Sequence, residues 1–479
     1  MTYRPLWIVA GLIAFTVLRL IPAPAGLSPE AWTVAALGVL MLVWWVTEAV
    51  PIPVTSLLPL IILPLFGVMD FAAAAPAYAS PIVLLLLGGF IIAQSVAAWN
   101  LHARIALAVV YKAGSSPAAM VGGFMLAAAL LSMWISNTAT AIMLTPIALS
   151  VAQRIGGKGW NTAPASIALL LGVAYGCSIG GVGTPIGTPT NLIVLGYIEN
   201  EFGRTIGFTD WMSYGVPVVA TVLPLAWLVL TRISLKVGSS AEAPARDVIA
   251  EERRKLGPIS TPERRVALTF AIIALAWILR QPMNELELFG TRPLAAVTDH
   301  WIAIAGAILF FLVPSGTGEG RALLTWPEAE RIPWGVLLLF GGGLSLAAAI
   351  TATGLGDWMG ARLEVVNALP LILLIGVMVA FVIFWTEVTS NVATASALMP
   401  VIGAVALAGG DDPLYLALPV AAAASCAFML PMATGPNAIA YASGAISISR
   451  MAKIGLVLNL LVILAISTLS AWILPHLLG

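Results

Sequence analysis

The sequence predicts an all-α polytopic membrane protein with about eleven transmembrane helices, two re-entrant helical hairpins and an inverted repeat. Three observations support this fold class. The chain of 479 residues is 60% hydrophobic and 9% charged, whereas soluble domains carry about a quarter charged residues. Its apolar stretches are long enough to cross a bilayer, and polar motifs of its first half recur in its second half. A chain with so little polar surface needs lipid around it rather than water.

Charge and cysteine content exclude several other classes of protein. Basic and acidic residues both number 22, so no basic field points to nucleic acid as a partner. The two cysteines, Cys177 and Cys426, are too few and too far apart for a disulfide scaffold or a zinc site. We expect both to be inert, buried thiols.

The first element is a transmembrane helix within residues 1–30. This stretch could also be read as a signal peptide with an Ala-Pro-Ala cleavage site at 23–25. We favour a retained helix, because only then does the orientation of the whole chain agree with the distribution of its basic residues.

The remaining crossings follow from hydropathy in a window of about 19 residues. Together with the first, we expect spans near 6–22, 31–47, 53–69, 82–100, 163–198, 211–231, 266–282, 300–314, 333–352, 413–445 and 454–475. They form a first repeat over 31–232, a cytoplasmic loop over 233–265 and a second repeat over 266–479. Gly and Pro interrupt 163–198 and 413–445, so these two spans are expected to be broken helices.

Two further apolar stretches, 117–153 and 365–405, are too long for one crossing, and each carries a polar cluster near its middle. Each half is shorter than the roughly 20 residues that a full span needs. We therefore expect two re-entrant hairpins, each with a polar turn at the depth of the membrane centre.

The basic residues test this arrangement. With the N-terminus inside and each hairpin returning to its own side, 17 of the 22 basic residues fall on the inner side. The largest group lies in and beside the 233–265 loop. This bias agrees with the positive-inside rule, and it predicts a plasma-membrane protein with a cytoplasmic N-terminus and an external C-terminus.

Three motifs relate the two halves of the chain. "VLLLLGG" at 83–89 matches "VLLLFGG" at 336–342, "SNTAT" at 136–140 matches "SNVAT" at 390–394, and "GTPTN" at 187–191 parallels "ATGPN" at 433–437. Five crossings separate the first pair, and an odd number inverts the second copy. Inverted repeats with broken helices are typical of secondary transporters, whose binding site lies where the breaks meet.

The chemistry of the clusters suits ions of both signs. Hydroxyl, amide and carbonyl oxygens can hold a small cation, while helix N-termini and Asn NH2 groups can hold an anion. Freed amides at Thr188 and Thr434 point to the anion, so we expect at least two cations flanking one anion. The alternative is that Ser, Asn and Thr only cap the turns. Four breaks converging on one place favour the binding site.

Two acidic residues inside apolar stretches, Glu48 and Glu387, are candidates for function. A proton relay is one reading. A buried structural acid bonded to backbone amides is the reading that we favour.

The paired clusters, "TEAVPIPVTSLLP" at 47–59 and "MATGPNAIAYASG" at 432–444 resemble the divalent anion:sodium symporter family over nearly the whole chain. The resemblance implies sodium-coupled uptake of a dianion such as succinate, a homodimer, and an elevator motion of a transport part against a fixed scaffold. It also implies at least two Na+ sites.

Site residues carried over from the family fall into three sets. The first cation set comprises Ser132, Ser136, Asn137 and the carbonyl of Gly187. The second comprises Thr386, Thr389, Asn391 and the carbonyl of Ala433. The substrate set comprises Asn137, Thr138, Thr188, Asn391, Val392 and Thr434. The chain departs from the family pattern with Val392 in place of Thr, and with Thr190 and Gly435 in place of prolines, which leaves the choice of substrate open.

Other functions remain to be weighed against import of a C4-dicarboxylate. A dicarboxylate exchanger, or a sodium-coupled carrier of citrate or sulfate, would use the same oxygen and amide groups. An intramembrane enzyme with Ser136 or Ser390 as nucleophile lacks a His or Lys base beside either serine. A channel would need a continuous polar pore.

Overall fold

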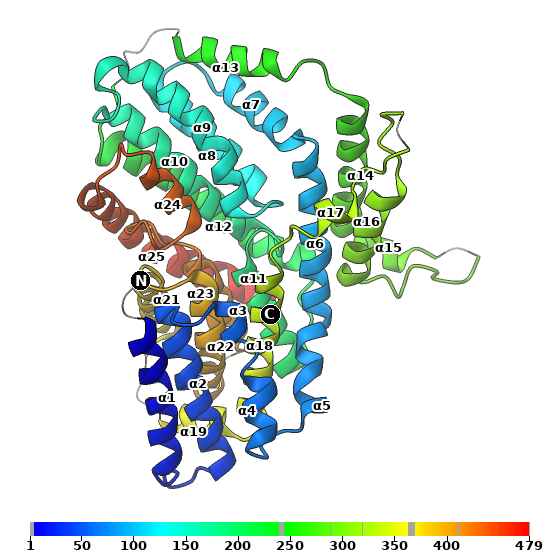
Figure 1. Cartoon of the computed structure of the whole chain (residues 1–479), viewed down its shortest axis with the longest axis vertical. Coiled ribbons are helices and arrows are strands. Elements are labelled where there is room, and N and C mark those ends of the chain that lie inside the picture. The colour runs from blue at the N-terminus through cyan, green and yellow to red at the C-terminus, as the bar shows by residue number, and fades with distance from the viewer. Residues whose placement is uncertain are drawn as a thin grey trace.

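The computed structural model describes residues 4–238, 244–287, 289–318, 320–362, 369–410 and 412–478, and these are helical throughout apart from turns and one isolated bridge (Figure 1). Seven of the described helices are long and apolar enough to cross a membrane. Several of the other expected crossings are apolar helices of 10–17 residues. The all-helical membrane class is therefore confirmed, whereas the number of eleven crossings stays a prediction.

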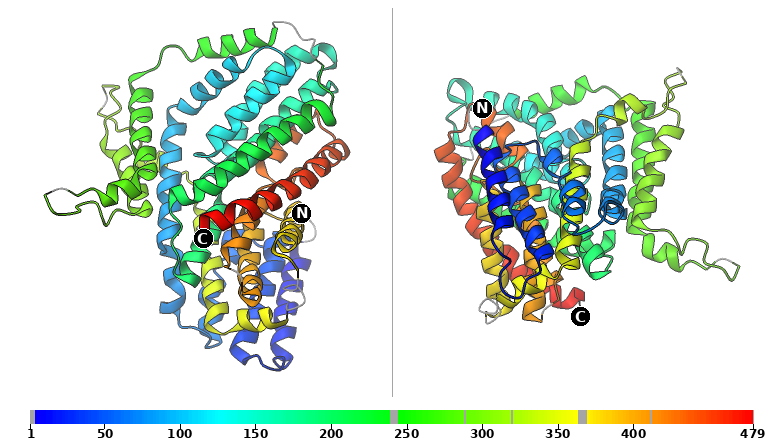
Figure 2. Two further views of the ribbon diagram at one scale, coloured as in Figure 1. Left: turned by 180° about the vertical axis from the view of Figure 1, so that it is seen from behind. Right: turned by 60° about the horizontal axis from the view of Figure 1, so that its bottom comes forward.

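The N-terminal helices pack as a pair. Helices α1 (Arg4–Leu20) and α2 (Pro29–Thr47) lie side by side in both figures that show the whole chain (Figures 1 and 2). At Gly11 a Cβ atom would lie 2.5 Å from Nε1 of Trp44, so glycine permits this close approach. The expected single span at 53–69 is instead two short helices, α3 (Ile52–Thr55) and α4 (Pro59–Leu65), because prolines interrupt it.

The stretch expected to form the first hairpin follows a helix that hydropathy did not predict. After α5 (Phe71–Ala74) and α6 (Pro81–Ala98), helix α7 (Leu101–Ala113) carries His102, Arg104 and Lys112, so its hydropathy is low. Helices α8 (Pro117–Ser132) and α9 (Asn137–Gly156) are separated by a break at 133–136. Helix α9 has 20 residues, so the expectation that both halves are too short to span is wrong for this half. It continues past Pro146 to Gly156.

The first broken helix is the most internal element. Helices α10 (Pro164–Gly180) and α11 (Pro189–Phe202) are separated by a short turn at Gly181–Gly183 and an extended segment. The segment Pro164–Gly183 is 94% buried, since α8, α9, α12 (Phe208–Leu228) and α24 (Gly435–Ala442) surround it. Its residue Cys177 is a free, buried thiol, as is Cys426 of the second half, in agreement with the sequence.

The second half contains the counterparts of these elements. Its helices are α14 (Thr261–Ile278), α15 (Arg280–Glu285), α16 (Asp299–Leu312), α17 (Trp326–Ala329), α18 (Trp334–Ala352), α19 (Leu355–Arg362), α21 (Leu371–Thr386), α22 (Asn391–Gly409), α23 (Leu414–Ala424), α24 (Gly435–Ala442) and α25 (Ile448–Leu478). The breaks at 387–390 and 425–434 repeat those of the first half. The outer end of the second hairpin stretch, at 365–368, lies outside the described residues.

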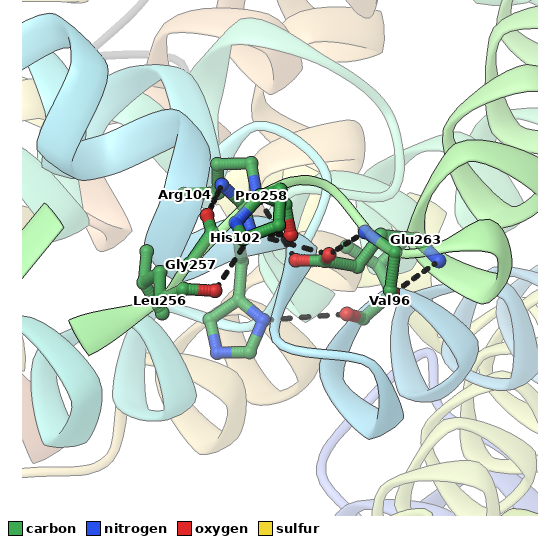
Figure 3. Close-up of polar contacts among 8 residues, drawn as sticks. Val96, His102, Arg104, Leu256, Gly257, Pro258 and Glu263 are labelled. Atoms are coloured by element: carbon green, nitrogen blue, oxygen red, sulfur yellow. Dashed lines mark hydrogen bonds and ion pairs between the residues drawn. The ribbon is translucent and has the colours of Figure 1, made fainter. Parts of the chain in front are cut away.

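The loop expected at 233–265 contains a helix, α13 (Pro244–Lys255), which runs along α7 and α9 (Figure 1). Arg104 of α7 fastens the segment that links α13 to α14. Its guanidinium donates to Glu263 at 3.0 and 3.2 Å and to the carbonyls of Gly257, Leu256 and Pro258 at 3.0, 3.2 and 3.4 Å (Figure 3). We call this group of contacts the Arg104 clamp.

The helices of the two halves interleave. Helices α8 to α12 pack against α21 to α25, with direct contacts between α10 and α24, α12 and α25, and α11 and α22. Helices α1 to α6, α14, α16 and α18 border this group (Figure 2). The four breaks therefore come together inside one body, from residues far apart in the chain.

Candidate substrate and cation site

The polar clusters and the helix breaks meet at a cavity of about 360 Å³. All six residues expected to bind the substrate line it, namely Asn137, Thr138, Thr188, Asn391, Val392 and Thr434. Ser136 and Ala433 of the two cation sets line it as well. The structure thus brings residues from both halves of the chain to one place.

Part of the cavity wall was not expected from the sequence. Phe90 of α6, together with Pro333 and Val336 at the start of α18, closes the cavity on the side of the bordering helices. A signal was present, because the repeated "VLLLLGG" motif ends at Gly89, directly before Phe90, and its copy begins at Val336.

Four helices begin at this cavity. Their first residues or N-caps are Asn137 of α9, Thr188 before α11, Asn391 of α22 and Thr434 before α24. Each helix N-terminus carries roughly half a positive charge, so the four together supply about two. No Asp, Glu, Lys, Arg or His occurs among the described residues that line the cavity. An uncharged wall with these helix ends suits an anion of about two charges.

The first cation set is assembled around the break at 133–136. The hydroxyl of Ser132 donates to Oδ1 of Asn137. Gly187 lies against the same group, since a Cβ atom there would lie 3.0 Å from the carbonyl oxygen of Ser132. Ser136 caps α9, because its hydroxyl accepts from the Ala139 amide at 3.3 Å. It also lines the cavity, so capping the helix does not exclude a place in the site.

The second cation set has a similar pair. The hydroxyl of Thr386 donates to Oδ1 of Asn391 at 2.8 Å and lies 3.2 Å from the carbonyl of Ala424, a residue that the sequence did not single out. Thr389 is placed differently from the other expected members. Its hydroxyl bonds to Thr394 at 2.6 Å and donates to the carbonyl of Trp385 at 3.0 Å.

The two broken helices are held open in the same way. The amide of Asn191 donates to the carbonyls of Gly181 and Thr184 at 2.9 and 2.8 Å. The amide of Asn437 donates to Ala427 and Leu430 at 2.9 and 3.1 Å. The spacing is identical in the two halves, which supports the repeat found in the sequence. The Oδ1 atoms of both asparagines are buried and have no partner within the described chain.

The two halves also contact each other at the site. Thr190 bonds to Ser425 at 2.7 Å, hydroxyl to hydroxyl. A Cβ atom at Gly435 would lie 2.3 Å from Oγ1 of Thr138, so the start of α9 in one half touches the start of α24 in the other. Thr190 and Gly435 are the positions where the family pattern has prolines. In this chain each of the two residues contacts a residue of the other half.

The two acidic candidates differ in environment. Glu387 is 3% exposed and accepts from the amides of Phe428, Met429 and Leu430 at 2.7, 2.8 and 2.9 Å. The reading of a structural acid bonded to backbone amides is confirmed for this residue. For Glu48 it is wrong, because the side chain is exposed and the residue ends α2 with a left-handed backbone at φ 47°.

The donor atoms fit a hard monovalent cation. Both sets offer hydroxyl, amide and carbonyl oxygens next to an unwound segment, which is how transporters hold Na+. Buried oxygens without partners, such as Oδ1 of Asn191 and Asn437, remain available at the breaks. Helix N-termini, oxygens suited to a small cation and a polar cavity inside a bundle of apolar helices are the features of a membrane transporter rather than an enzyme.

Comparison with known proteins agrees with this class. The model of the sodium:sulfate symporter transmembrane region matches residues 4–478. A protein of Staphylococcus saprophyticus called sodium-dependent dicarboxylate transporter SdcS is 37% identical over 98% of this chain and 92% of its own length. The protein of that name from Staphylococcus aureus RF122 is 38% identical over 98% and 91%.

Two solved structures share the fold. The YdaH transporter of Alcanivorax borkumensis has a TM-score of 0.59 at 16% identity, covering 99% of this chain and 98% of its own. The MtrF efflux pump of Neisseria gonorrhoeae has a TM-score of 0.60 at 15% identity, covering 98% and 94%. The chain belongs to the sodium:sulfate symporter family, and the resemblance to the divalent anion:sodium symporters is confirmed.

Proposed function

We propose that this protein is a secondary active transporter that imports a dianionic C4-dicarboxylate, of the succinate, fumarate or malate type, together with Na+. The cavity carries this proposal: four helix N-termini meet there, and the described residues that line it have no charged side chain, so a dianion matches the roughly two positive charges of the helix ends. The name of the Staphylococcus relatives, a sodium-dependent dicarboxylate transporter, supports the same substrate and cation.

In this proposal different site residues bind the two carboxylates of the substrate and the two Na+ ions. Asn137, Thr138 and Thr188 hold one carboxylate, and Asn391, Val392 and Thr434 hold the other. One Na+ is held by Ser132, Ser136, Asn137 and the carbonyl of Gly187. A second is held by Thr386, Thr389, Asn391 and the carbonyl of Ala433. The assignment is supported by Asn137 and Asn391 on the cavity wall and by the bonds that Ser132 and Thr386 make to them.

Sodium is needed for the energetics of import. A negative cell interior opposes entry of a dianion by about 4.6 kcal/mol per 100 mV, twice the cost for one charge. Two co-transported cations cancel that opposition, and a third would turn the membrane potential into a driving force. We therefore propose at least two cations per substrate.

The motion and topology belong to the same proposal. The stretches around the two Ser-Asn clusters would act as re-entrant hairpins, and α8 to α12 with α21 to α25 would move as an elevator against the bordering helices. The protein would sit in the plasma membrane as a homodimer, with its N-terminus cytoplasmic and its C-terminus outside. The packing of α8 to α12 against α21 to α25 supports treating these helices as one moving part.

Uptake into proteoliposomes tests the proposal. Radiolabelled succinate should accumulate under an inward Na+ gradient and not under an equal K+ gradient. Unlabelled fumarate and malate should compete, and citrate and sulfate should compete weakly. Uptake that does not depend on Na+ but requires a dicarboxylate inside the liposomes would show that the protein is an exchanger. Stronger competition by citrate or sulfate than by fumarate or malate would mean that the substrate is not a C4-dicarboxylate. The comparison matters because Val392 stands where the family pattern has Thr.

A further inference from the structure

Glu387 is a buried carboxylate whose partners are all neutral. Besides the three backbone amides, it accepts from Nδ2 of Asn459 at 2.8 Å. No Lys, Arg or His forms an ion pair with it within the described residues. A buried charge without a counter-ion is costly even when it is hydrogen-bonded, so its presence here calls for a function.

In the first half of the chain, the position that corresponds to Glu387 is uncharged. Aligning Ser136 with Ser390 places Met133 opposite Glu387. The Met133 side chain lies against Gly183, where an added Cβ atom would be 2.6 Å from its terminal methyl carbon. The hydroxyl of Thr184 donates to the carbonyl of Met133. A methionine therefore occupies the position that the carboxylate has in the second half.

The loops that these residues contact correspond to each other as well. Asn191 binds the carbonyls of residues 181 and 184, and Asn437 binds those of 427 and 430. Residues 182–184 therefore correspond to residues 428–430, whose amides Glu387 accepts. The two junctions share these asparagine bonds, and the residue before each hairpin turn is neutral in the first half and acidic in the second.

That charge lies at only one of the two cation sets. Glu387 follows Thr386, whose hydroxyl bonds to Oδ1 of Asn391 and approaches the carbonyl of Ala424. The second set also has Thr389 where the first half has Ile135. Within a protein interior, a unit charge within about 8 Å changes the affinity for a cation by more than about tenfold.

We propose that Glu387 is a positioning residue that makes the second cation site the stronger of the two, so that it fills first. The carboxylate holds the backbone of 428–430 in place and supplies a fixed negative charge one residue along the chain from Thr386. The first site, with Met133 in the corresponding position, binds its cation more weakly. This inference rests on the two Na+ sites of the proposed function.

A Na+ titration of the purified protein, without substrate, tests it. The readout is the melting temperature in detergent, with choline keeping the ionic strength constant, because an ion that binds the folded state stabilises it. Glu387→Gln keeps the shape and removes the charge. Glu387→Asp keeps the charge and disturbs the geometry, and Asn459→Ala removes one hydrogen bond from Glu387 while leaving its charge.

We expect the Na+ concentration for half-maximal stabilisation to rise tenfold or more in Glu387→Gln. In Glu387→Asp and Asn459→Ala it should change by less than about threefold, even where the melting temperature itself falls. Unchanged Na+ affinity in Glu387→Gln would overturn the inference, as would an equal loss in all three variants, which would mean a purely structural role. A wild-type protein that does not respond to Na+ would instead contradict the proposed function.

Discussion

At the scale of single residues, the contact between Gly435 and Thr138 explains a departure from the family pattern. Proline is the residue that the pattern has at position 435, and the added Cβ atom would overlap Oγ1 of Thr138 at 2.3 Å. Thr138 lies on the cavity next to Thr434. Glycine here lets the start of α9 approach the start of α24, and the shape of the cavity depends on that approach.

We predict that Gly435→Ala pushes Thr138 from its position and weakens substrate binding by roughly tenfold, since overpacking costs about 1–3 kcal/mol. The measurement is the apparent KM for succinate at saturating Na+. Gly38→Ala is the matched control, because a Cβ atom at Gly38 meets nothing within 4 Å. An unchanged KM in Gly435→Ala would contradict the contact.

The sequence predicted the cavity residues well at this scale because polar residues in apolar stretches are conspicuous. Asn137 and Asn391 could be found from their motif alone, and both line the cavity. Phe90 and Val336 were not singled out, because an apolar residue in an apolar helix is inconspicuous and only the repeated motif at their positions marked them. Ala424 contributes a main-chain carbonyl, which residue type does not reveal.

At the scale of helices, the Arg104 clamp joins two connections between the groups of helices. Helix α7 leads from α6 to α8, and α13 leads from α12 to α14. The side chain of Arg104 is 23% exposed and that of Glu263 is 9% exposed, so the pair is shielded from water. The clamp thereby holds the beginning of α14 beside the beginning of α7 (Figure 3).

Replacing Arg104 by Gln should free the segment at 256–260 and lower the free energy of unfolding by about 2 kcal/mol, the value of a charge-assisted pair. Limited trypsin digestion reports this directly, because Arg253, Arg254 and Lys255 lie beside the clamp. Cleavage there should become several-fold faster. Arg104→Lys should be intermediate, since Lys keeps the charge but lacks the planar fork. Equal cleavage rates in all three proteins would refute the clamp.

The pair of Arg104 and Glu263 also makes the stability of the folded protein depend on pH. Burial alone would raise the pKa of Glu263, but bonds from Arg104 and from the Ser260 amide and hydroxyl lower it below the ordinary value. A lowered pKa in the folded state contributes stability that is present above the unfolded value of about 4.3 and is lost as the pH falls through the folded value. The difference in melting temperature between wild type and Arg104→Gln should stay constant from pH 8 to about 5 and shrink below about pH 4. A difference that shrinks already at pH 6 would contradict this assignment.

Hydropathy located the buried helices and missed those that lie along the surface. Helices α7 and α13 are rich in charge, so a search for apolar windows passes over them. The span at 53–69 met the apolar criterion, but it forms two short helices, the second of which begins at Pro59. Window averages do not register the missing amide of a single proline.

At the scale of the whole molecule, the contact between α18 and α22 lies between the proposed fixed and moving parts. A Cβ atom at Gly343 would be 3.3 Å from Cβ of Ser396, close to the separation of about 3.8 Å in a disulfide. A second close pair, Gly376 of α21 and Ser467 of α25, lies within the proposed moving part, with 3.7 Å from the added Cβ to Oγ.

We predict that oxidising the double variant Gly343→Cys/Ser396→Cys stops succinate uptake and that a reductant restores it, because the elevator cannot move while cross-linked. The double variant Gly376→Cys/Ser467→Cys should keep its uptake after oxidation. Full uptake by the first variant, with the cross-link verified by mass spectrometry, would contradict an elevator motion between these helices.

The arrangement of the two halves could be inferred from the repeated motifs because they recur in the same order. Matching hydrogen bonds at Asn191 and Asn437 support that inference. The role of the difference between the junctions at Met133 and Glu387 could not be inferred, since a lone acid in an apolar stretch is compatible with several roles. The sequence shows Glu387 opposite Met133, but only the structure shows that backbone amides and Asn459 hold the carboxylate.

The most direct test of the central claim, that one cavity binds a dianion together with Na+, is equilibrium binding of radiolabelled succinate to the purified protein. Binding should require Na+, with K+ unable to replace it, and should be lost in Asn137→Ala and in Asn391→Ala, since each asparagine lies at both a cation set and the cavity. Binding that persists in K+, or that survives in either variant, would contradict the claim.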